Sequence, residues 1–164
     1  AGAEADGVLP LLFPPEHYFN VKPLVDEGIA KRNSQLAPLD FAACLWVSLA
    51  EDRNAARRVL AQKIAYYGQS LGPLILDQLG LVREDFAAIE RAIHLEKDEE
   101  KAIGLVDERM LRIGVVGSPT DVIERLEPLV AAGTTHLSFG PPLGPEPLEA
   151  VALLGQVIAH FRTR

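Results

Sequence analysis

The stretch Gly133-Thr-Thr-His-Leu-Ser-Phe-Gly-Pro-Pro-Leu-Gly-Pro-Glu-Pro-Leu-Glu-Ala-Val-Ala-Leu-Leu-Gly155 decides the fold. Its first part, Thr135 to Phe139, predicts a buried strand, and Gly140 to Pro147 predicts a loop stiffened by prolines. The segment that follows predicts a helix, because its apolar residues recur at steps of three or four: Leu148, Val151, Leu154, Ile158 and Phe161. Strand, loop and helix in this order form one unit of a parallel α/β fold.

Two further strand and helix pairs precede this unit. Val8 to Phe13 predicts a buried strand followed by a helix from Pro14-Pro15 to about Lys31. Phe41 to Leu49 is the clearest strand, and the amphipathic segment from Glu51 to Tyr67 predicts the helix after it. Strands separated by helices favour parallel pairing, since a parallel neighbour requires a crossover connection.

The middle of the chain predicts a helical insertion. Two or three short helices are expected, over Pro73 to Leu79, Glu84 to Ile93 and Glu99 to Met110. Ile113 to Val116 is either a short strand or an extended connector. Ser118-Pro119-Thr120-Asp121 predicts a helix start, with Ser118 as the N-cap, and Gly133 predicts the end of that helix.

Composition excludes several classes of protein. The formal net charge of −7 and the lack of a basic stripe argue against nucleic-acid binding. A single cysteine, Cys44, excludes an internal disulfide and suggests the cytoplasm, and no apolar run is long enough to span a membrane. The chain does not begin with Met, and its opening residues are typical of a fold entered partway, so we expect one partial domain over residues 1–164.

Alternation along the two best strands sorts their side chains into two faces. One face of each strand is apolar and is expected to pack under helices. These residues are Phe41, Ala43, Leu45, Val47 and Leu49 in the first strand and Leu137 and Phe139 in the second. Trp46 and Ser48 are expected on the opposite face near the carboxyl end, where barrel enzymes bind ligands. The alternatives are that Trp46 only packs and that Ser48 caps the next helix. His136 begins a strand far from that end, and the histidine spacing suggests no metal site.

The loop after Phe139 supplies the other candidate binding residues, namely Gly140, Pro141, Pro142 and Gly144. Glycines let a backbone approach a ligand closely, and a following helix start can hold an anion. The alternative is that the prolines only shape a rigid connection. The glycine spacing does not match a dinucleotide or P-loop motif.

Three segments carry a family resemblance: Asp98 to Met110, Gly117-Ser-Pro-Thr-Asp121, and Phe139-Gly-Pro-Pro-Leu-Gly-Pro145. Together they resemble the C-terminal part of the methylenetetrahydromethanopterin reductases, within the luciferase-like superfamily. The resemblance implies the C-terminal portion of a (β/α)8 TIM barrel, with about three βα units and the helical insertion after the second. Three strands cannot close such a barrel.

The same resemblance implies an oxidoreductase that uses the deazaflavin coenzyme F420 to transfer hydride to or from a methylene-pterin substrate. FMN-dependent monooxygenases of the superfamily are an alternative, and a non-catalytic assembly module is a third. The resemblance implies that most of the coenzyme site lies in a first half that this chain lacks, so it assigns no catalytic residue here. We expect the chain alone to be inactive. The expected partners are a small-molecule substrate, the missing half of the barrel or a second chain, and further copies of itself.

Overall fold

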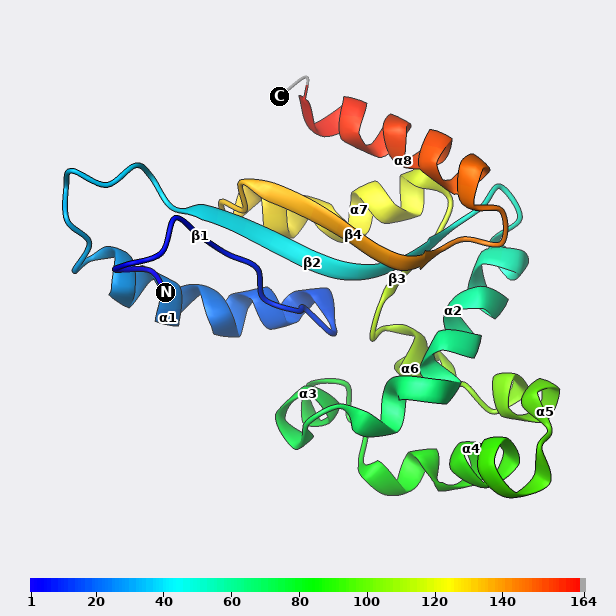
Figure 1. Cartoon of the computed structure of the whole chain (residues 1–164). Helices are drawn as coiled ribbons and strands as arrows, with labels where there is room; N and C mark the ends of the chain where they lie inside the picture. Colours follow the sequence, from blue (N-terminus) through cyan, green and yellow to red (C-terminus); the bar gives the residue numbers. More distant parts are fainter. Residues whose placement is uncertain (163–164) are drawn as a thin grey trace.

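The computed structural model describes residues 1–162, and its centre is a four-stranded parallel sheet (Figure 1). Strand β2 (Asp40–Leu49) pairs with each of the other three. β1 (Gly7–Val8) pairs at its amino end, β3 (Val115–Gly117) at its carboxyl end, and β4 (His136–Leu143) along most of its length. The sheet is open, because it does not close on itself. The segment from Ile113 to Val116, for which the sequence left a strand and a connector as alternatives, contributes to a strand, β3.

The first strand is shorter than the sequence predicts. Only Gly7–Val8 forms a regular ladder, although Leu11 makes an isolated bridge to Cys44, and Leu12 donates to the Cys44 carbonyl at 2.9 Å. Pro10 has no N–H to donate, so a continuous ladder cannot form across it. The chain then turns through the 3-10 segment Pro15–His17 into α1 (Tyr18–Ile29), which agrees with the predicted helix.

One face of the sheet is covered by helices, as alternation predicts. Phe41, Ala43, Leu45, Val47 and Leu49 are all buried on this face, and Leu137 and Phe139 pack against the same cluster. The covering helices are α1, α7 (Pro119–Ala131) and α8 (Pro147–Arg162), which contribute the buried residues Tyr18, Val25, Val122, Leu126, Leu129, Leu153, Leu154 and Val157. Burial of this apolar surface is the main force that holds the helices to the sheet.

The last strand extends into the segment predicted as a loop. Gly140 to Leu143 belong to β4, so the predicted end at Phe139 is wrong, and the connection to α8 is only Gly144 to Glu146. Proline is tolerated here because the ladder is irregular at this point: Trp46 pairs with Gly140 and Ser48 with Leu143, with a register shift between them.

The segment between β2 and β3 forms a helical insertion at the carboxyl end of β2, on the side away from α7 and α8 (Figure 1). It begins with α2 (Arg53–Tyr67) and the 3-10 turn Gly68–Ser70. The shorter elements follow: α3 (Pro73–Gln78), a 3-10 turn Arg83–Phe86, α4 (Ala87–Arg91), a π-helical turn Ala92–Glu96, α5 (Glu99–Gly104) and α6 (Glu108–Leu111).

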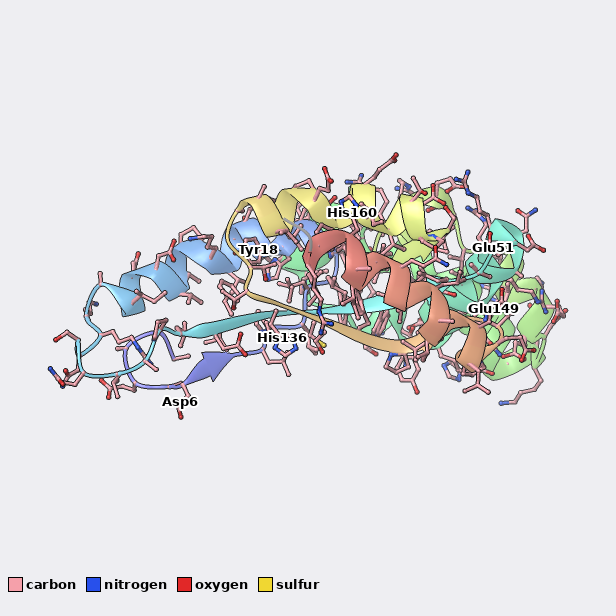
Figure 2. All side chains as sticks on the ribbon, turned by 90° about the horizontal axis from the view of Figure 1, so that it is seen from above. Asp6, Tyr18, Glu51, His136, Glu149 and His160 are labelled. Atoms are coloured by element: carbon pink, nitrogen blue, oxygen red, sulfur yellow. The ribbon has the colours of Figure 1, made fainter. Side chains whose placement is uncertain are left out.

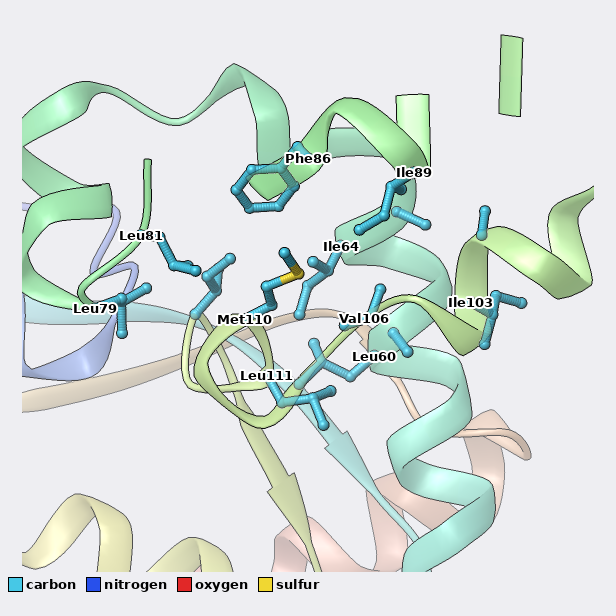
Figure 3. Packing of buried hydrophobic residues seen from close by; sticks show 14 of the residues in the cluster. Leu60, Ile64, Leu79, Leu81, Phe86, Ile89, Ile103, Val106, Met110 and Leu111 are labelled. Carbon is cyan, nitrogen blue, oxygen red and sulfur yellow. The ribbon is translucent and has the colours of Figure 1, made fainter. Parts of the chain in front are cut away.

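The insertion has its own hydrophobic core, which includes Leu60, Ile64, Phe86, Ile89 and Met110 (Figure 3). The predicted single helix from Glu99 to Met110 is wrong, because the chain breaks between α5 and α6. The Asp107 carboxylate accepts a hydrogen bond from the Met110 amide at 2.9 Å and so starts a new helix. This second core holds α2 in a defined position beside the end of the sheet.

The start of α7 confirms the capping prediction. The Asp121 carboxylate accepts from the Ser118 amide at 2.8 Å, and the Ser118 hydroxyl accepts from the Asp121 amide at 3.4 Å. At the other end, Gly133 has a φ of 97°, a left-handed conformation that glycine adopts without strain. Within residues 1–162, the helices are all too short or too polar to cross a bilayer.

Candidate functional site

The carboxyl ends of β2 and β4 lie at the same end of the molecule. Glu51, just after β2, and Glu149, in the first turn of α8, are both found there, whereas Asp6 lies at the opposite end (Figure 2). In parallel α/β folds ligands bind at the carboxyl ends of strands. This end of the sheet is therefore where a site is to be sought.

Trp46 forms the centre of an aromatic cluster at this end. Its ring centroid lies 4.4 Å from that of Phe13, which follows β1, and 6.3 Å from that of Tyr67, the last residue of α2. Phe13 is buried, Trp46 is half-buried, and Tyr67 is 52% exposed. Trp46 therefore packs against other side chains, which was one of the two sequence interpretations. We call the partly exposed surface formed by Phe13, Trp46 and Tyr67 the aromatic wall.

Lys63 lies over this wall. Its Nζ is 4.3 Å from the centroid of the Tyr67 ring and 5.2 Å from that of Trp46. Lys63 and Tyr67 are four residues apart on α2 and so share one helix face. The sequence analysis did not predict Lys63, Tyr67 or Phe13 as site residues. For Lys63 and Tyr67 the one local signal was their four-residue spacing, which places both on the same face of the helix.

Ser48 is fully buried between β2 and α2. Its hydroxyl donates a hydrogen bond of 2.7 Å to the carbonyl oxygen of Ala56, in the first turns of α2. The capping of α2 itself is done by Asp52, whose carboxylate accepts from the Asn54 amide at 2.9 Å. In this structure Ser48 thus ties the strand to the helix, while its predicted contact with a coenzyme stays a prediction.

The predicted glycine and proline residues line the end of β4. Gly140 lies beside Trp46: a Cβ there would be 3.9 Å from Cδ1 of the indole and 3.1 Å from the Leu45 carbonyl oxygen. Pro141 is exposed and Pro142 half-buried. Gly144 is buried, and a Cβ at this position would overlap the Leu49 carbonyl oxygen. Gly140 thus adds no side-chain atom beside Cδ1 of the indole, and Gly144 lets the backbone approach the end of β2.

Leu143, between these glycines, has a φ of 70°. A left-handed conformation is unfavourable for leucine by roughly 1–2 kcal/mol. Such strain persists only where surrounding contacts hold it, and it is concentrated at functional sites. The end of β4 is thus held in a defined, strained shape, and the Leu143 side chain packs against the cluster on the helix-covered face of the sheet.

His136 lies apart from this end, as the sequence indicates, at the start of β4 (Figure 2). Its Nδ1 is 3.2 Å from the Asp40 carboxylate, and both side chains are exposed. The Asp40 carboxylate accepts a hydrogen bond from the Thr135 hydroxyl and another from the His136 ring, and in that order of importance these hold the pKa of the Asp40 carboxyl below its ordinary value. In the part of the chain that the structure describes, no cluster of three or more His, Cys, Asp and Glu side chains is arranged to hold a metal ion.

The chain belongs to the family described as luciferase-like monooxygenase, whose model matches residues 1–136. It is similar to two enzymes named 5,10-methylenetetrahydromethanopterin reductase. The enzyme of Methanopyrus kandleri is 33% identical over 99% of this chain, and that of Archaeoglobus fulgidus is 29% identical over 93%. In each case the match covers 47% of the relative, so the chain spans about half the length of the curated relatives that it matches.

Solved structures agree with this relationship. The coenzyme F420-dependent tetrahydromethanopterin reductase of Methanopyrus kandleri superposes on 98% of the chain with a TM-score of 0.86 at 32% identity, using 47% of that structure. An F420-dependent secondary alcohol dehydrogenase shares the fold, with a TM-score of 0.61 at 16% identity. The predicted membership of the luciferase-like superfamily and the likeness to these reductases are confirmed.

Proposed function

We propose that the chain forms one partial domain, the C-terminal half of the barrel of a coenzyme F420-dependent oxidoreductase. Its proposed reaction is hydride transfer to or from a methylene-pterin substrate. The observation that carries the proposal is the likeness to the Methanopyrus kandleri reductase, which extends over 99% of the chain in sequence and 98% in structure. Local features alone would not distinguish this function from others on the same fold.

The surface at the carboxyl end of the sheet fits a planar coenzyme ring. Aromatic and apolar walls bind flat ligands, and Phe13, Trp46 and Tyr67 supply such a wall. Gly140 adds no side chain in front of the indole. When bound, the deazaflavin would supply the hydride chemistry, and the role of this chain would be to hold and orient its ring.

Within that proposal the predicted coenzyme residues divide into two groups. Trp46, Gly140, Pro141 and Pro142 would line the site, because they are exposed or half-buried at the strand ends. Ser48 and Gly144 would act through the backbone that they hold, since both are buried.

The proposal also assigns a partner to the open edges of the sheet. β1 and β4 each pair only with β2 among the described strands, and the β1 segment exposes Leu9 and Leu11, at 61% and 60%. A barrel closes such edges with further strands. We propose that a first half-barrel, supplied by the same protein or a second chain, covers them, that the complete protein oligomerises, and that this chain alone is inactive.

A second candidate function is that of an FMN-dependent monooxygenase, which the description of the matching family favours. Titration of the complete protein, with the proposed first half-barrel present, with F420 and, separately, with FMN distinguishes the two, with ring absorbance as the readout. We expect saturable binding of F420 and weaker binding of FMN. The reverse preference would support the monooxygenase and contradict the reductase proposal.

A further inference from the structure

Helix α2 carries four cationic side chains, and one of them is placed differently from the rest. Arg53 pairs with Asp121 at 2.8 Å, Arg57 with Glu108 at 2.5 Å, and Arg58 with Glu100. Lys63 has no carboxylate within ion-pairing distance in residues 1–162; it lies over the Trp46 and Tyr67 rings instead.

The rings hold the ammonium group in place without neutralising it. A cation over an aromatic face gains about 0.5–1 kcal/mol at an exposed site and keeps its full charge. The Lys63 side chain is half-buried, so its stem is ordered against the wall formed by Phe13, Trp46 and Tyr67. Its charge therefore stays available to a ligand that lies against the wall.

The surroundings make this cation selective. The chain has a formal net charge of −7, and the exposed residues Glu51 and Glu149 lie at the carboxyl end of the sheet (Figure 2). Glu51 and Glu149 disfavour an anion in their own vicinity, whereas the Lys63 ammonium group attracts one. If the flat part of a ligand contacts Trp46, a negatively charged group of the same ligand would bind most favourably at Lys63.

We propose that Lys63 binds an anionic group, a carboxylate or a phosphate, of the ligand that occupies the carboxyl end of the sheet. Lys63, Trp46 and Tyr67 then form one unit, in which the rings contact the flat part of the ligand and the ammonium group fixes its orientation. This inference deepens the proposed function and rests on it for the location of the ligand.

The experiment uses the complete protein, with the proposed first half-barrel present, and three probes: coenzyme F420, inorganic phosphate and glutamate. Trp46 is the single tryptophan of the 164 residues, so the part of the emission that is lost in Trp46→Phe reports events beside Lys63. Binding of F420 is followed by ring absorbance, and phosphate and glutamate are followed by Trp46 emission. The variants are Lys63→Met, which keeps the stem and removes the charge, Lys63→Arg, which keeps the charge, and Lys31→Met as the matched control on an exposed turn.

Loss of a charge-assisted hydrogen bond should raise the Kd for F420 about tenfold in Lys63→Met. Lys63→Arg should stay within about threefold of the wild type, and Lys31→Met should not change. The stronger of phosphate and glutamate as a competitor identifies the source of the anionic group. Melting temperatures of all variants, measured in parallel, separate a binding effect from loss of fold.

Two outcomes overturn the inference. If Lys63→Met binds F420 as tightly as the wild type, Lys63 only packs against the rings, and the proposed function still stands. If none of the three probes gives a saturable response, the site does not bind anions. A Lys63-dependent response to phosphate or glutamate without F420 binding would support the anion site while contradicting the coenzyme assignment.

Discussion

The hydroxyl of Ser48 donates a 2.7 Å hydrogen bond to the carbonyl oxygen of Ala56, and this buried contact joins the central strand to the helix that follows it. The bond connects β2, the strand that carries Trp46, with α2, the helix that carries Lys63 and Tyr67. The geometry of the candidate site therefore depends on it.

Replacing Ser48 with alanine should lower the free energy of unfolding by about 1–2 kcal/mol, because a buried hydrogen bond is lost. Urea unfolding followed by circular dichroism measures the change. Ser70→Ala, at an exposed position in the turn after α2, is the matched control and should change stability by less than about 0.5 kcal/mol. Equal stability of Ser48→Ala and wild type would show that the contact contributes nothing.

Gly144→Ala should destabilise the chain by at least about 2 kcal/mol, because the added Cβ would overlap the Leu49 carbonyl oxygen. Gly155→Ala is the opposite case. It lies in α8, has no atom within 4 Å of an added Cβ, and should gain roughly 0.5–1 kcal/mol. Thermal unfolding of both variants checks the pair, and a Gly144→Ala variant as stable as Gly155→Ala would refute the close approach.

The Asp121 carboxylate should make stability depend on pH. Burial alone would raise its pKa, but hydrogen bonds from the Ser118 amide and hydroxyl and the Arg53 charge outweigh burial and hold the pKa below the ordinary 3.8. Since the folded pKa is the lower one, the carboxylate stabilises the fold fully above pH 3.8, and the stabilisation disappears as the pH falls through the folded value.

Asp121→Asn should therefore be less stable than wild type near neutral pH, by about 1 kcal/mol. The difference should shrink as the pH falls below 3.8. Unfolding free energies of both proteins from pH 2.5 to 7 measure it, with Asp77→Asn, at an exposed position in α3, as the control. If the difference in unfolding free energy between Asp121→Asn and wild type is independent of pH, the lowered pKa of Asp121 is contradicted.

The aromatic wall makes a separate prediction about binding. Trp46→Leu should weaken F420 binding by about threefold to tenfold, the range expected when one aromatic contact is lost, while Trp46→Phe should retain most of the affinity. Ring absorbance of the coenzyme is the readout. Phe19→Leu changes an exposed aromatic residue on α1 and serves as the control. If Trp46→Leu and Trp46→Phe bind alike, ring contact with Trp46 is not part of the site.

Much of the fold was visible in local sequence. Periodicity predicted β2, α2, α7 and α8 within a few residues, because their apolar spacing and caps act over one or two turns. Alternation predicted which face of β2 is covered. The wrongly predicted boundaries lie at three places. At Pro10 a missing N–H shortens β1, and after Phe139 an irregular ladder allows two prolines in the strand. Asp107 caps a new helix and so divides a predicted one.

The candidate site was only partly predictable. Trp46 and Gly140 could be placed near one end of the sheet, because strand alternation and parallel pairing follow from neighbouring residues. Tertiary structure alone decided that Phe13, Trp46, Lys63 and Tyr67 meet, since they come from β2, α2 and the segment after β1, whose separation along the chain carries no signal of contact. Local spacing thus determined the elements and their faces, and long-range packing of the insertion against the sheet decided the site.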